Sequence, residues 1–141
     1  MENRSLIKLI NEISKIYYDK IAKISDIEFS NEKTPLLILS ELSQRDGLSQ
    51  SELVRSTHMK GSTVSIAISK MEERGYIVKE DNNYDKRSVK IYLTKKGREL
   101  NDKIIDQLKS IESSIISGIS PREARIVAFA LETVLENCKR I

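Results

Sequence analysis

The sequence predicts a mostly α-helical chain that carries one small β-hairpin. Long segments near both ends of the 141 residues carry apolar side chains at helical spacing, and two shorter helical patterns lie between them. Residues 76–93 alternate apolar and polar side chains instead, which is typical of a pair of strands. With 39% apolar and 32% charged residues, the chain has the composition of a highly charged globular protein with a sizeable core.

The positive charge is concentrated in the middle third of the chain. Residues 48–98 contain eleven Lys or Arg and six Asp or Glu, a balance of +5, whereas the whole chain has a net charge of +3. A basic excess confined to one region is typical of a surface that meets a polyanion.

Cysteine usage and hydropathy indicate the compartment. Cys138 is the only cysteine, so no intrachain disulfide can form and a reducing interior is expected. The N-terminal segment lacks the apolar block of a signal peptide, and no apolar stretch approaches the ~20 residues that span a bilayer. We therefore expect a cytoplasmic protein without a membrane partner.

Two amphipathic helices are predicted in the first third of the chain. The first covers about residues 6–24, where Ile and Leu recur on one face. The second begins between residues 30 and 35, because Thr34 suits an N-cap and Pro35 suits the first helical position. Gly47 is its predicted C-cap. The predicted buried residues of the second helix are Leu36, Leu39 and Leu42.

A helix-turn-helix follows. In the sequence SQSE, Ser49 is predicted to cap a helix that runs to about Thr57, while Glu52 reaches back to the cap. After a tight turn, another helix begins near Gly61 and stops at Gly75. Its inward face is predicted to consist of Val64, Ala67, Ile68 and Met71.

The alternating region is predicted to form a hairpin. Residues 76–80 and 88–93 are rich in β-formers, and the polar residues 81–87 would connect them. In the second run, Val89, Ile91 and Leu93 alternate with polar residues, so one face is expected to be buried.

Two helices are predicted to complete the chain. Thr94 should cap a long helix that ends before Gly118, and a second capping box, SPRE, begins at Ser120. The apolar stripe of the long helix is Leu100, Ile104, Leu108, Ile111 and Ile115. The stripe of the final helix is Ile126, Val127, Ala130, Leu131, Val134, Leu135 and Cys138.

The order of a helix-turn-helix and a hairpin indicates binding to double-stranded DNA. The major groove admits one α-helix, and a helix-turn-helix places its second helix there. Small hydroxyls can reach base edges, and Ile66 could contact a thymine methyl group. The predicted base-facing residues, opposite the buried face, are Ser62, Thr63, Ser65, Ile66, Ser69 and Lys70.

Further contacts to DNA are predicted on either side of this helix. The start of the supporting helix has free backbone N–H groups, which favour a phosphate. The hairpin tip, with Lys86 and Arg87, would reach past the second helix to the neighbouring DNA backbone or minor groove. The predicted phosphate contacts are Ser49, Gln50, Ser51 and Lys60.

Other classes of protein are less well supported by the sequence. Ser and Thr on a helix face are often only solvated, so a winged-helix protein-interaction module without DNA binding stays open. The chain has no nucleophile elbow and no phosphate-cradling Gly loop, and we predict no catalytic residues. One histidine, His58, and one cysteine do not make a zinc site of the usual kind, and we predict no metal or other cofactor.

A specific combination of motifs supports the DNA-binding interpretation. The segment LSQSELVRSTHMKGSTVSIAISKMEERGYIVKEDNNYDKRSVKIYLTKKG, residues 48–97, resembles MarR-family winged-helix transcriptional regulators. It matches the family's supporting helix, a recognition helix ending here in MEERG, and a wing with DKR before LTKKG. The order and spacing of the three pieces make the resemblance specific.

The resemblance implies a fold with a winged helix-turn-helix lobe and a helical dimerisation lobe. Residues 1–28 and 99–141 would form the dimerisation helices, and residues 29–98 the DNA-binding lobe, within a single MarR-like domain. It also implies that Arg87 enters the minor groove and that Asp85 helps to hold it. We expect a homodimer that represses by occupying a pseudo-palindromic operator.

The resemblance further implies a small aromatic or anionic effector between the two lobes. The adjacent Tyr17 and Tyr18 could line its cavity, although packing in the core explains one of two neighbouring helical residues more simply. Oxidant-sensing members carry a reactive cysteine near the N-terminus, which this chain lacks. Cys138 lies on an apolar stripe and is expected to be a buried structural thiol.

Overall fold

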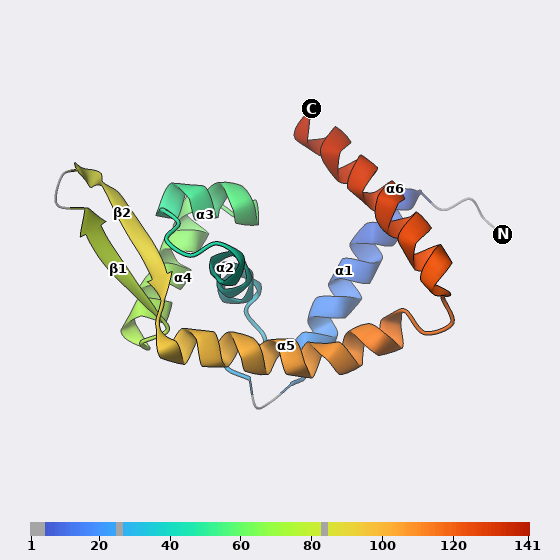
Figure 1. Cartoon of the computed structure of the whole chain (residues 1–141), viewed down its shortest axis with the longest axis horizontal. Coiled ribbons are helices and arrows are strands. Elements are labelled where there is room, and N and C mark those ends of the chain that lie inside the picture. The colour runs from blue at the N-terminus through green and yellow to red at the C-terminus, as the bar shows by residue number, and fades with distance from the viewer. Residues whose placement is uncertain (1–4, 25–26, 83–84) are drawn as a thin grey trace. The chain divides into compact units, whose positions relative to one another are not determined.

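The computed structural model describes residues 5–24, 27–82 and 85–141, and the side chains of residues 82 and 85–88 lie outside the described part. Within these residues, six helices and one antiparallel hairpin follow one another in the predicted order (Figure 1). The mostly α fold with a winged helix-turn-helix is therefore confirmed. The elements are α1 (Leu6–Ala22), α2 (Lys33–Gln44), α3 (Gln50–Thr57), α4 (Gly61–Glu73), β1 (Ile77–Asn82), β2 (Asp85–Leu93), α5 (Lys95–Ile115) and α6 (Pro121–Lys139).

The chain divides into two compact units, Met1–Asp106 and Gln107–Ile141. In the first unit, α2, α3 and α4 pack against one another, and the hairpin packs against α3 and α4 (Figure 1). The predicted inward face of α4 is confirmed, because all four of its apolar residues are buried. The largest fully buried side chains are Ile38, Leu39, Leu42, Leu53, Val64, Ile68, Met71, Ile77 and Ile91.

Hydrogen bonds along its second strand connect the hairpin to the helical part of the first unit. Ile77 pairs with Leu93, and the Ile91 N–H donates a 2.8 Å hydrogen bond to the Leu48 carbonyl on the opposite edge. Asp46 adds a side-chain anchor. One carboxylate oxygen accepts from the Leu93 N–H at 3.0 Å, and the other accepts from Arg98 Nη2 at 2.9 Å. The base of the wing is therefore fixed to the end of α2 and the start of α5.

Three local predictions were wrong at element boundaries. Helix α2 begins at Lys33 with Glu32 as its N-cap, so Thr34 is not the cap. Pro35 is still accommodated, because the N–H groups of a first helical turn have no intrahelical partner. The C-cap of α2 is Arg45 rather than Gly47. Gly47 instead has a φ of +76° and lies against the Tyr92 ring.

The third difference concerns the hairpin connection. Residues 81–87 were predicted as a loop, but the strands continue until Asn82 pairs with Asp85, with an irregularity in register after Glu80. Cross-strand hydrogen bonding extends the ladder through polar residues because their side chains need not be buried in an open, two-stranded ribbon.

The second unit contains the end of α5 and the whole of α6. The predicted capping box is present, with Ser120 Oγ accepting from the Glu123 N–H at 3.1 Å and Glu123 accepting from the Ser120 N–H at 3.1 Å. No residue of α6 is buried. Cys138 is exposed, so its predicted burial is wrong for the single chain. Among the described residues, no helix is long and apolar enough to cross a membrane.

Candidate nucleic-acid interface

Helix α4 presents a small, mostly hydroxyl-bearing surface opposite its buried face. Ser62, Ser65 and Ser69 are exposed, and Thr63 is half-buried. Ile66 is 71% exposed at the middle of this row. Short side chains allow DNA to approach the helix closely. The hydroxyls can then hydrogen-bond to base edges, and the apolar side chain can contact a thymine methyl group.

Lys70, one helical turn after Ile66, borders this surface but directs its side chain to another part of the protein. Its ammonium donates a 2.5 Å hydrogen bond to Glu32 Oε1 and lies 5.8 Å from the centroid of the Phe29 ring. The charge of Lys70 is therefore already paired within the protein. Its sequence spacing alone did not show this, because Glu32 precedes it by 38 residues.

The start of α3 is closed by its own capping box. Ser49 Oγ accepts from the Glu52 N–H at 3.2 Å, and Glu52 Oε1 accepts from the Ser49 N–H at 3.4 Å. The backbone and side-chain hydrogen bonds with Ser49 lower the pKa of Glu52, with a smaller effect of the charges of Lys90 and Arg45. A carboxylate therefore already stands at this end of α3. Ser51 is exposed and Gln50 half-buried beside it.

The start of α4 is open by comparison. Its N-cap residue, Lys60, makes no side-chain cap hydrogen bond, and the Lys60 side chain is exposed. The preceding turn is made by His58, which caps α3 in a left-handed conformation with φ of +56° and is exposed. Arg55 in the last turn of α3 is exposed as well. Arg55 was not among the phosphate contacts predicted from the sequence, although it precedes His58 in the turn by only three residues.

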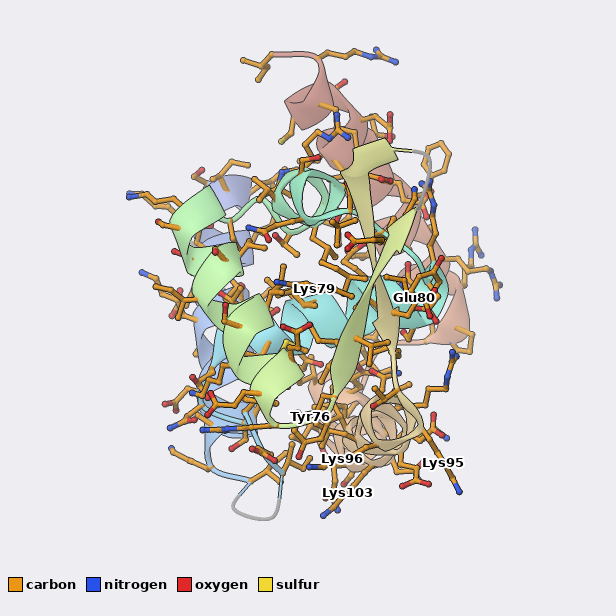
Figure 2. The ribbon with its side chains drawn as sticks, turned by 90° about the vertical axis from the view of Figure 1, so that its left-hand side faces the viewer. Tyr76, Lys79, Glu80, Lys95, Lys96 and Lys103 are labelled. Atoms are coloured by element: carbon orange, nitrogen blue, oxygen red, sulfur yellow. The ribbon has the colours of Figure 1, made fainter. Side chains whose placement is uncertain are left out.

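The wing is described only in part. The side chains of Asp85, Lys86 and Arg87 lie outside the described residues, although their backbone belongs to β2. On the neighbouring strand, Lys79 and Glu80 are exposed (Figure 2). Lys79 Nζ lies 3.9 Å from a carboxylate oxygen of Glu72 at the end of α4. The hairpin and α4 thus meet through a solvent-exposed ion pair.

The tyrosine pair of α1 is half-buried rather than part of the core. The Tyr17 and Tyr18 rings meet edge to face with centroids 5.6 Å apart, and Lys33 Nζ lies 4.8 Å from the Tyr18 centroid. Burial raises the pKa of the Tyr18 hydroxyl above its ordinary value. In the part of the chain that the structure describes, no group of three His, Cys, Asp or Glu side chains is placed to hold a metal ion.

Comparisons with known proteins agree with this geometry. The model of the MarR family matches residues 33–88, which include both helices of the helix-turn-helix and most of the hairpin. The HTH-type transcriptional regulator Hpr of Bacillus cytotoxicus is 36% identical over 81 residues, which are 57% of this chain and 44% of Hpr. The chain therefore matches less than half the length of that relative.

Solved structures extend the similarity beyond the matched segment. A MarR-family transcriptional regulator from Silicibacter pomeroyi has a TM-score of 0.79 at 25% identity, over 95% of this chain and 96% of the other. Bordetella bronchiseptica BpsR, whose DNA binding is regulated by 6-hydroxynicotinic acid, has the same fold, with a TM-score of 0.79 at 19% identity over 95% of each chain. The family model thus matches the helix-turn-helix and most of the hairpin, and along almost the whole fold the chain is similar to solved MarR-family regulators.

Proposed function

We propose that the chain is a dimeric transcriptional regulator that binds a specific DNA sequence in the cytoplasm. The observation that carries the proposal is the outward face of α4, where exposed serines surround Ile66 on the second helix of a helix-turn-helix. A solvent-exposed Ile on such a helix is explained by contact with thymine methyl groups in the major groove. Neither a catalytic residue nor a cofactor belongs to the proposal.

The phosphate contacts fit the start of α4 better than the start of α3. The uncapped first turn of α4 leaves backbone N–H groups for an anion, and Arg55, His58 and Lys60 are exposed around the turn. At α3, Ser49 and Glu52 already satisfy each other. Gln50 and Ser51 stay candidate contacts at its edge. Lys70 is proposed to act within the protein, through Glu32, rather than on DNA.

Dimerisation is supported by the apolar side chains of α6. Ile126, Val127, Leu131 and Leu135 are 60%, 51%, 45% and 50% exposed in the single chain. Apolar stripes of this kind on a terminal helix are buried when two copies associate around a two-fold axis. Two recognition helices would then meet half-sites about 34 Å apart, in a pseudo-palindromic operator. Occupancy of a promoter in this way would repress transcription by blocking polymerase.

A small aromatic or anionic effector would relieve this repression. The support is the fold shared with BpsR, whose DNA binding responds to 6-hydroxynicotinic acid. An effector can shift operator affinity only by binding the two conformations of the dimer with different affinities. Operator titrations across a panel of aromatic acids and other metabolites test this point. Unchanged affinity throughout the panel would leave protein abundance as the means of regulation.

The central experiment is the selection of bound duplexes from a random DNA library, with the enriched sequences read directly. We expect a pseudo-palindrome whose affinity falls steeply with salt, because bound phosphates displace condensed counterions. If no duplex is enriched even at low salt, the DNA-binding proposal fails. The chain would then be a winged-helix protein-interaction module.

Replacing Ile66 with Ala should weaken operator binding by about 1 kcal/mol, because a thymine-methyl contact is lost. Affinity for unrelated DNA should stay the same, since Ile66 contributes no charge. Fluorescence polarisation with the selected operator and a scrambled duplex measures both. Ile105→Ala is the control, because Ile105 is also an exposed Ile, at 45%, but lies on α5. An equal loss on both duplexes for Ile66→Ala would contradict base contact.

Replacing Arg87 with Ala should weaken operator binding by roughly 1–3 kcal/mol, with the greatest loss where flanking DNA is A·T-rich. The reason is that a narrow minor groove concentrates negative potential for a guanidinium. Asp85 is proposed to limit the Arg87 rotamers. Arg87→Lys should restore only part of the affinity, since an ammonium is more strongly hydrated and lacks the planar fork.

Lys86→Ala is the matched control on the same strand. It should weaken binding evenly across sequences and reduce the salt slope by about one unit, as expected for a single phosphate contact. Parent-like operator affinity of Arg87→Ala at physiological salt would show that the wing makes no contribution to binding.

A further inference from the structure

The segment between α1 and α2 lies along one flank of the recognition helix. We define Ile27–Glu32 as the connector. Arg74 Nη1 donates a 2.7 Å hydrogen bond to Glu28 Oε1, and the Tyr76 hydroxyl donates to Glu28 Oε2. Lys70 Nζ donates a 2.5 Å hydrogen bond to Glu32 Oε1. Two carboxylates of the connector thus bind successive cations on α4 and at its C-cap.

Phe29 fills the space between these ion pairs. Its side chain is 3% exposed, and its backbone has a φ of +67°, a left-handed conformation that is unfavourable for a bulky residue. The Phe29 ring meets the Tyr76 ring edge to face, with centroids 5.4 Å apart, and lies 5.4 Å from Arg74 Cζ. The surrounding contacts hold this strained residue in place, so the connector is an ordered part of the lobe.

Tyr76 ties the same cluster to the start of α5. Lys96 Nζ lies 4.4 Å from the centroid of the Tyr76 ring and donates a 2.7 Å hydrogen bond to the Arg74 carbonyl (Figure 2). Burial, and then the hydrogen bond to Glu28, raise the pKa of Tyr76 to about 12, so its hydroxyl keeps its proton. The same hydrogen bond lowers the pKa of Glu28, which stays charged. Donor and acceptor therefore persist together across the physiological range.

These contacts occupy the flank of α4 between its outward and its buried faces. Val64 and Ile68 face the core, Ile66 faces outward, and Lys70, one helical turn after Ile66, is turned to the connector. Lys70 and Arg74 are one helical turn apart, so their ion pairs with Glu32 and Glu28 lie on the same flank of α4. Rotation of α4 about its axis would break both pairs at once. The apolar contacts of α4 fix its rotation less strictly than the ion pairs do, because the hydrophobic effect is non-directional.

We propose that Glu28 and Glu32 are positioning residues for sequence readout: they fix the rotation of α4, and with it the side chains that face the bases. They also neutralise Lys70 and Arg74, which would otherwise strengthen sequence-independent attraction to phosphates. The inference rests on the proposed DNA-binding function and adds residues outside the helix-turn-helix to it. The connector is thus a determinant of specificity rather than of overall affinity.

The test is the double variant Glu28→Gln/Glu32→Gln in the full chain. Polarisation titrations with the selected operator and a scrambled duplex of equal length, over a range of salt, give the ratio of specific to non-specific affinity. We expect this ratio to fall about tenfold, comparable to the loss of one base contact. Affinity for the scrambled duplex should be retained or increased. Glu99→Gln/Asp102→Asn is the control, because it removes two exposed carboxylates from α5 and matches the change in charge.

Hydrogen exchange supplies a readout that does not depend on DNA. Amides of residues 70–74 should exchange faster in the double variant than in the parent and the control, while those of α3 stay unchanged. An unchanged affinity ratio, or equal losses on both duplexes together with a lower melting temperature, would overturn the inference while leaving DNA binding intact. If the parent itself does not discriminate between the two duplexes, the proposed function fails first, and the positioning role fails with it.

Discussion

Replacing both Leu131 and Leu135 of α6 with Glu is expected to convert the dimer into monomers. Operator binding should then weaken by about 10²–10⁴-fold, because that is the usual gain in affinity from joining two binding sites. Both leucines are half-exposed in the single chain, and both belong to the apolar stripe proposed to meet a second copy. The two introduced carboxylates of each copy would be buried in the interface without cationic partners. Light scattering gives the mass, and polarisation with the selected operator gives the affinity.

Arg125→Glu is the matched control for this variant. It changes the net charge of the chain by the same two units and lies at an exposed position of α6 outside the stripe. The control should remain dimeric. Circular dichroism must show that the Leu131→Glu/Leu135→Glu variant keeps its helices. A parent chain that is monomeric at micromolar concentration with intact helices would count decisively against dimerisation through this helix.

Replacing Gly97 with Ala should destabilise the fold by about 3 kcal/mol, at the upper end of the usual cost of overpacking. A Cβ at this position would lie 2.2 Å from the Tyr76 carbonyl oxygen and 3.2 Å from Leu93 Cδ2. The oxygen belongs to the backbone and accepts from the Thr94 N–H at 3.1 Å, so it cannot move without breaking the junction of the hairpin and α5. The glycine of the LTKKG motif is required for this close approach.

Gly61→Ala is the control for the glycine variant. Gly61 opens α4, and a Cβ there would have no heavy atom within 4 Å. Its replacement should stabilise the protein by about 0.5 kcal/mol, through the lower entropy of the unfolded chain. Urea unfolding followed by circular dichroism compares the two variants. Equal stabilities for Gly97→Ala and Gly61→Ala would show that the junction around Tyr76 relaxes freely.

Features that depend on neighbours in the sequence could be predicted from the sequence. Both capping boxes, at Ser49 and at Ser120, were predicted and are present, because each joins groups only three residues apart. Helical periodicity predicts the four buried residues of α4, and it also predicts that Ile66 is exposed on the opposite side of the helix. The family resemblance of residues 48–97 and the winged helix-turn-helix order came from the same local patterns, and both are confirmed.

The sequence was less informative at the boundaries of elements, where contacts with distant residues add to local preferences. Thr is a favoured N-cap residue and Glu is not, yet the N-cap of α2 is Glu32, whose side chain pairs with Lys70 of α4. The polar residues near the hairpin tip suit either a loop or an exposed ribbon, and pairing extends to Asn82 and Asp85. The exposure of Cys138 concerns the single chain, whose final helix buries none of its residues.

The sequence by itself determined the elements, the faces of the helices and the kind of surface that α4 presents. Only the tertiary structure decided which charges remain available on that surface. Lys70 and Glu32 are separated by 38 residues, and Arg98 and Asp46 by 52, so no helical or strand periodicity relates them. Periodicity describes how one segment turns its side chains, whereas an ion pair between distant segments forms only after packing brings their backbones together. The pairing of Lys70, and the positioning of α4 by its connector, therefore became visible only in the folded lobe.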